Sequence, residues 1–196
     1  MRTLTMLFIL VAAGTVALAQ APNAPKTNPP ASPANPYTAN TKLNYWGGKA
    51  AILRTAEIVP EEFYSFKPTE AVRSLGQILG HVADAQYTFC SLARGEKNPV
   101  RNIEKTKTSK ADLIAALKEA FAYCDKTFEG MSDSSGTEMV KFMGIDTPKL
   151  GALIANNQHL SEHYGNLVTY MRLKNIVPPS SDPVFMRQMM QQFMKQ

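Results

Sequence analysis

The chain has 196 residues, of which 19% are charged, and a formal net charge of +5. This length is enough for one domain with a full hydrophobic core. The basic residues form no stripe that alternates with aromatic side chains, so a nucleic-acid partner is not expected.

The first 19 residues have the pattern of a secretory signal peptide. Arg2 supplies a basic start, an uncharged apolar run follows, and the small-residue sequence ALA precedes Gln20. We expect cleavage near Ala19 and a secreted or periplasmic protein. The apolar run is too short and too poorly flanked for a stable membrane span, so no span is expected after cleavage. Retention of the run as an uncleaved anchor is the alternative.

Residues 20–37, QAPNAPKTNPPASPANPY, are rich in Pro, Ala and Asn. This composition predicts a semi-extended linker, because such a segment buries too little apolar surface to fold. The folded domain is expected to span residues 38–180. Residues 181–196 form a Met-rich tail that predicts an amphipathic helical turn or two.

The first half of the domain contains two segments with helical apolar periodicity. The first is expected from about residue 38 to 58, and one of its faces carries Leu43, Trp46, Ala50 and Leu53. The second is expected to start near Thr69, after Pro68, and to end near Gly95. Its apolar residues cover more than one face, which predicts a central helix.

Two further helices are expected in the second half of the domain. Ser109 and Asp112 have the spacing of a capping box at the start of the third helix. Thr147 is the expected cap of the fourth helix, with Pro148 at its first position and an end near Lys174. There is no convincing strand and no internal repeat. The sequence therefore predicts an all-α fold, a four-helix bundle.

The chain contains two cysteines, Cys90 and Cys124. Export would place them in an oxidising compartment, where a disulfide is one outcome. If the second and third helices are antiparallel neighbours, however, the two residues differ by roughly 15 Å along the bundle axis. A disulfide requires Cα atoms within about 7 Å of each other. We therefore expect two buried, unpaired thiols.

All three histidines of the chain lie in the middle of predicted helices. His159 and His163 are four residues apart, so they share one helical face and can bind the same metal ion. His81 lies near the middle of the second helix, at the level that His159 would occupy in a bundle. Three histidines with an open fourth position are typical of a catalytic zinc site. The alternative is a set of hydrogen-bonded core histidines without a metal.

The segment HLSEH, residues 159–163, also fits the H-x-x-E-H pattern of one class of zinc proteases. That class needs a further acidic ligand downstream. No Glu follows His163, and Asp182 is the only Asp beyond it, in a Pro-rich turn. A peptidase is therefore disfavoured.

The sequence resembles the DinB-like (YfiT-type) superfamily over about residues 40–180. The segments FKPTEAVRSLGQILGHVADAQYTFC and NNQHLSEHYGNLVTYMRLKNIVPPS carry the resemblance. It implies a four-helix bundle that binds a divalent metal ion, Zn or Ni for preference, through His81, His159 and His163. The family includes metal-dependent thiol transferases and isomerases, suspected hydrolases and many proteins without a known reaction.

We therefore expect an exported metal-dependent hydrolase or group (thiol) transferase that acts on a small molecule of unknown identity. The alternative is a non-catalytic metal-binding or interaction protein, and a homodimer is compatible with either. The candidates for orienting the histidine rings are Asp84, Asn156 and Glu162, and Tyr164 and Tyr170 are candidates for orienting a substrate. The presence of an open cavity beside the metal position would distinguish the enzyme from the alternative.

Overall fold

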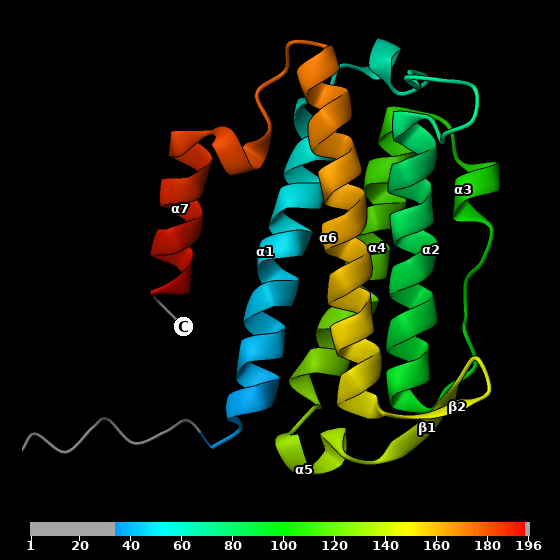
Figure 1. The fold of residues 1–196 in the computed structure, drawn as a ribbon, viewed down its shortest axis with the longest axis vertical. Helices are drawn as coiled ribbons and strands as arrows, with labels where there is room; N and C mark the ends of the chain where they lie inside the picture. The colour runs from blue at the N-terminus through cyan, green and yellow to red at the C-terminus, as the bar shows by residue number, and fades with distance from the viewer. Residues whose placement is uncertain (1–33, 195–196) are drawn as a thin grey trace, which may run out of the picture. The chain divides into compact units, whose positions relative to one another are not determined.

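The computed structural model describes residues 34–194 of the chain, and four long helices dominate it (Figure 1). The predicted signal peptide and the predicted linker as far as residue 33 lie outside the described residues. Helix α1 (Pro36–Ile58) and helix α6 (Lys149–Leu173) run in one direction, whereas α2 (Leu75–Arg94) and α4 (Lys110–Glu129) run in the other. The predicted all-α four-helix bundle is confirmed.

Short elements connect the long helices. They are η1 (Glu61–Phe63), α3 (Ile103–Thr106), α5 (Asp133–Gly136), the strands β1 (Met139–Phe142) and β2 (Ile145–Pro148), η2 (Pro179–Ser181) and α7 (Pro183–Phe193). Helix α7 is longer than the predicted turn or two and lies beside α1, outside the four long helices (Figure 1). Among residues 34–194, no helix has both the length and the apolar character that crossing a membrane requires.

The core receives large side chains from all four long helices, including Tyr45, Ile52, Leu79, Phe121 and Leu160. The apolar face predicted for α1 is confirmed only in part, because Trp46 and Leu53 pack against the core as partly buried side chains. Leu43 is 45% exposed, whereas Tyr45 and Ile52 are fully buried. The Tyr45 ring stacks on Phe128, and its hydroxyl donates a hydrogen bond to the Phe121 carbonyl oxygen at 3.0 Å. A Tyr at the centre of this face can be buried because its one polar atom has a partner.

Helix α2 starts at Leu75, six residues after the predicted start at Thr69. Ser74 and Gln77 form a reciprocal capping box. The Ser74 hydroxyl accepts from the Gln77 N–H, and the Gln77 side chain accepts from the Ser74 N–H. This cap satisfies backbone donors that a helix leaves free at its N-terminus. His81 is therefore closer to the start of its helix than the sequence pattern suggested. The predicted Ser109 cap of α4 is confirmed, since its hydroxyl accepts from the Asp112 N–H.

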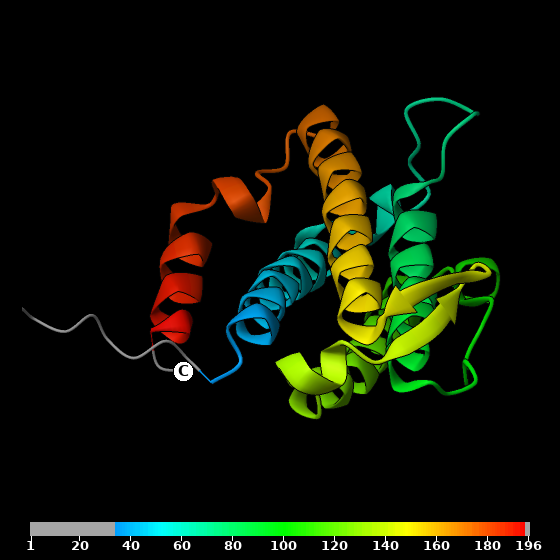
Figure 2. The same ribbon diagram turned by 60° about the horizontal axis from the view of Figure 1, so that its bottom comes forward.

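A β-hairpin precedes α6 in a region where no strand was expected. Strand β1 pairs with β2 in antiparallel register, with Met139 opposite Pro148 and Phe142 opposite Ile145. Thr147 therefore belongs to a strand and is not the helix cap. The loop residues Met143 and Gly144 both have positive φ, 50° and 85°. This two-residue loop was missed because Met-Gly lacks the Asn-Gly or Asp-Gly signal of such hairpins. Figure 2 shows the strands beside the N-terminal end of α6.

Cys90 and Cys124 form a disulfide, with Cα atoms 5.3 Å apart. The prediction of two unpaired thiols is wrong because its premise, that the second and third long helices are antiparallel, is wrong. Residues 95–109 return along the length of the bundle, so α4 starts at the same end as α2 (Figure 1). Leu113, near the start of α4, accordingly packs against Gly76 and Gly80, near the start of α2. The two cysteines then lie at the same level.

Candidate metal centre

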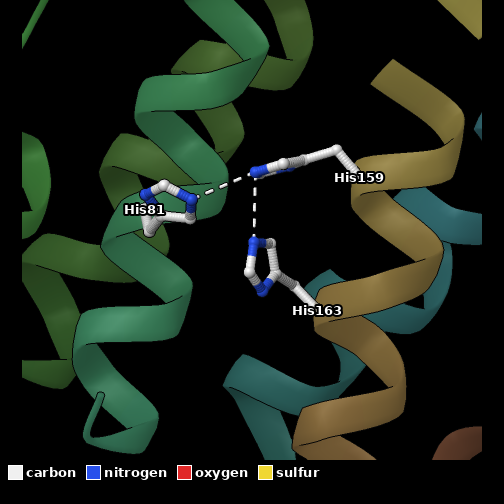
Figure 3. A group of neighbouring side chains, drawn as sticks. All are labelled: His81, His159 and His163. Atoms are coloured by element: carbon white, nitrogen blue, oxygen red, sulfur yellow. Dashed lines mark hydrogen bonds between the residues drawn. The ribbon is translucent and has the colours of Figure 1, made fainter. Parts of the chain in front are cut away.

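The three histidines converge between α2 and α6 (Figure 3). The Nε2 atom of His159 lies 3.0 Å from Nε2 of His81 and 3.1 Å from Nε2 of His163. One nitrogen from each ring lies within 4.8 Å of the others. The three histidines could therefore hold one metal ion. Among residues 34–194, the group contains no fourth His, Cys, Asp or Glu.

The helix packing explains this convergence. His159 and His163 are one helical turn apart on α6 and point to the same side. The neighbouring stripe of α6, Leu153, Leu160 and Leu167, is buried in the core and fixes the rotation of the helix. Because α2 is antiparallel to α6 and adjacent to it, His81 reaches the same level from the opposite side (Figure 3).

The surroundings favour the neutral form of two of the imidazoles. Burial, which has the largest effect, and the neighbouring His163, His81 and Arg73 together lower the pKa of His159 from 6.5 to about 3. Burial also lowers the pKa of His163, with smaller contributions from His81 and Arg73, while Glu162 and Glu104 act in the opposite direction. Neutral imidazole is the form that binds metal ions.

The outer ring nitrogens have three different environments. Nδ1 of His81 lies 3.1 Å from a carboxylate oxygen of Glu104. Nδ1 of His163 lies 3.4 Å from the Asn166 side-chain amide. Nδ1 of His159 is buried and has no hydrogen-bond partner among the described residues.

None of the three residues proposed to orient the rings does so. The Asp84 carboxylate accepts from the backbone N–H groups of Ile103 and Glu104. Asn156 forms a reciprocal buried pair with Gln86, and Glu162 is exposed and makes no hydrogen bond to a ring.

The two tyrosines also have structural roles. The Tyr170 hydroxyl donates to the Arg73 carbonyl oxygen, and the Tyr164 hydroxyl accepts from the Ser180 N–H. The residue that the sequence interpretation missed is Glu104. It lies in a polar connection without a motif, so only the path of that connection reveals its role.

Two different surfaces flank the histidines. On one side, Phe89 packs against the His159 ring, and Phe142 of the hairpin packs against Phe89, with centroid separations of 5.6 Å in both pairs. On the other side is a cavity of about 740 Å³ whose lining includes Arg73, Glu104, His163, Asn166 and Tyr170. His159 thus contacts an aromatic pair, and His163 borders a cavity.

Comparisons with known proteins agree with this architecture. A sequence model of the DinB superfamily matches residues 48–167, more than half of the chain. A DinB-like protein from Bacillus cereus ATCC 10987 is similar in structure, with a TM-score of 0.62 and 16% identity; the match covers 70% of this chain and 93% of that chain. A DinB-like protein from Bacillus subtilis matches with a TM-score of 0.58 and 20% identity, covering 69% of this chain and 92% of that chain. No curated protein matches the sequence.

Proposed function

The chain belongs to the DinB superfamily, and on this premise we propose that His81, His159 and His163 bind one divalent metal ion in an enzyme that acts on a small molecule. The observation that carries the proposal is the convergence of three imidazole nitrogens, together with the cavity that one of the three histidines, His163, lines. A group of nitrogen donors of this kind suits Zn and Ni, which we propose as the metals, as well as Cu and Fe.

The hydrogen-bonding chemistry of the group favours a shared cation. The Nε2 atom of His159 faces two other Nε2 atoms, at 3.0 and 3.1 Å. A neutral imidazole nitrogen has either one proton or one lone pair, so it can satisfy only one of these neighbours. An ion between three lone pairs satisfies all of them. The separations of 3.0 Å to at most 4.8 Å also bracket the roughly 3.4 Å between two ligands of a tetrahedral zinc ion.

The surroundings favour an enzyme over a closed structural site. When bound, a divalent ion would supply Lewis-acid polarisation of a substrate oxygen or activation of a nucleophile. The cavity lined by His163 provides space for a substrate beside one of the three histidines. Phe89 packs against the His159 ring and gives this part of the site an apolar neighbour. We propose a hydrolase or a group (thiol) transferase as the reaction class.

We also propose that the protein acts outside the cytoplasm, as the signal-peptide pattern of residues 1–19 suggests. The Cys90–Cys124 disulfide supports this proposal, because disulfides persist mainly in oxidising compartments. N-terminal sequencing of exported material should give a start near Gln20. A start at Met1 would contradict cleavage.

The test compares three forms of the purified protein: as isolated, stripped by a chelator, and reloaded with Zn or Ni. Each is assayed for hydrolysis of a p-nitrophenyl ester and for transfer of a low-molecular-weight thiol to an aryl halide. We expect one activity that disappears on stripping and returns on reloading. His163→Ala should abolish this activity, whereas Gln158→Ala, an exposed position on the same helix, should preserve it. Tight metal binding without metal-dependent turnover in either assay would instead favour a non-catalytic metal-binding protein.

A further inference from the structure

Glu104 connects two side chains at the edge of the histidine group. One carboxylate oxygen lies 3.1 Å from Nδ1 of His81, and the other accepts from Nε of Arg73 at 2.9 Å. The Glu104 side chain is 22% exposed, so it is mostly withdrawn from solvent. Both oxygens therefore have a partner, and the carboxylate has a defined orientation beside the ring.

The backbone around Glu104 is positioned by α2. The two carboxylate oxygens of Asp84 accept from the N–H groups of Ile103 and Glu104, at 2.9 and 3.0 Å, at the start of α3. Gly80 allows α3 to approach α2 closely, since a Cβ atom at this position would lie 2.7 Å from Cα of Glu104. Gly80, His81 and Asp84 follow one another within little more than one turn of α2. The same segment of helix thus carries His81 and holds α3 in place.

We propose that Glu104 is a positioning residue that holds His81 in the tautomer with the proton on Nδ1. In this tautomer, Nδ1–H donates to the carboxylate, and the lone pair of Nε2 points at the other two histidines. Arg73 keeps the second carboxylate oxygen occupied and so maintains the orientation of Glu104. This inference rests on the proposed metal site, which it deepens by assigning a role to a residue outside the ligand set.

The outer ring nitrogens of the three histidines have different hydrogen-bond partners, and this difference makes the proposal specific to His81. Among the described residues, only His81 has a carboxylate on its outer nitrogen; that of His163 faces an amide. Loss of Glu104 should therefore change the His81 tautomer and leave the other two rings largely unaffected. Glu162 is the matched control, because it lines the same cavity and is exposed without a hydrogen bond to any ring.

The experiment has two readouts at one fixed pH. Zn affinity is measured by competition with a chromogenic chelator, and the tautomer of each histidine is read in the metal-free protein from two-bond ¹H–¹⁵N spectra. We expect Glu104→Ala to weaken Zn binding about 10–100-fold and to shift His81 away from the Nδ1–H form. Glu104→Gln, which retains an acceptor oxygen, should give an intermediate result. Glu162→Ala should remain within about 3-fold of the parent.

The possible outcomes test the proposed metal site and the proposed role of Glu104 separately. A parent protein that binds no Zn would overturn the proposed metal site, while the tautomer spectra would still test Glu104. A parent that binds Zn, together with a Glu104→Ala variant of unchanged affinity and unchanged His81 tautomer, would overturn the role of Glu104 and leave the site intact. If Glu104→Ala does not fold, Glu104→Gln provides the same comparison, and a parent-like result for that variant would refute the proposal.

Discussion

Cys90 and Cys124 join α2 to α4 through a disulfide in the interior of the bundle, where both residues are fully buried. The sulfur of Cys124 also lies 3.9 Å from the side-chain nitrogen of Asn156, on the helix that carries two of the histidines. The covalent link and the buried polar pair of Asn156 and Gln86 therefore connect three of the four long helices.

Removal of this disulfide should destabilise the protein strongly. The disulfide joins two residues that are 34 apart in the sequence. Removing a disulfide typically lowers the free energy of unfolding by roughly 2–4 kcal/mol. Guanidinium unfolding of the parent and of the Cys90→Ser, Cys124→Ser double variant measures the effect. Under nonreducing conditions, the mass of the parent should be lower by two hydrogen atoms than the mass calculated for two free thiols. Two free thiols in protein exported to an oxidising compartment would contradict the pairing.

The metal-free protein should lose stability as the pH falls from about 6.5 towards 3. The unfolded chain protonates His159 near its ordinary pKa of 6.5, whereas the folded protein does so near pH 3. Between these values the unfolded state binds more protons, so acidification lowers the free energy of unfolding. The lowered pKa of His163 acts in the same direction.

The control for this pH dependence is His159→Gln, because the carboxyl groups titrate in both proteins and cancel in the comparison. Thermal or denaturant unfolding at several pH values should show a shallower dependence in the variant. Identical slopes in the two proteins would mean that His159 is not held neutral by the fold.

Two glycines should respond in opposite ways to the same substitution. Gly47→Ala adds a methyl group with nothing within 4 Å in the middle of α1, so it should stabilise the protein by up to about 1 kcal/mol. Gly80→Ala places Cβ 2.7 Å from the backbone of Glu104, so it should displace α3 and destabilise the protein. Denaturant unfolding measures both. Equal effects of the two variants would contradict the close packing of α3 on α2.

The sequence predicted the histidine group for a simple physical reason. Helical periodicity fixed the shared face of His159 and His163. The predicted mid-helix position of His81 placed it at a similar height, and the two helices still bring it there although α2 begins six residues later than predicted. The path of the segments that connect the helices was harder to predict from the sequence. The direction in which residues 95–109 cross the bundle determines whether Cys90 meets Cys124 and whether Glu104 meets His81. Neither periodicity nor composition encodes that direction, so the disulfide was judged wrongly and Glu104 was missed.

The β-hairpin was not predicted from the sequence for a different reason. Its Met143–Gly144 loop lacks a recognised turn signal, and its strands have only four residues each. Short strands of this kind have too few alternating positions to be distinguished from irregular structure. The hairpin nevertheless contributes Phe142 to the aromatic side of the histidine group.

The most direct test of the central claim is anomalous diffraction from crystals of the Zn-loaded protein, recorded on both sides of the zinc absorption edge. The account predicts one anomalous peak per chain between α2 and α6, about 2.0–2.1 Å from a ring nitrogen of each of His81, His159 and His163. A strong zinc peak elsewhere, with none between these three rings, would contradict it.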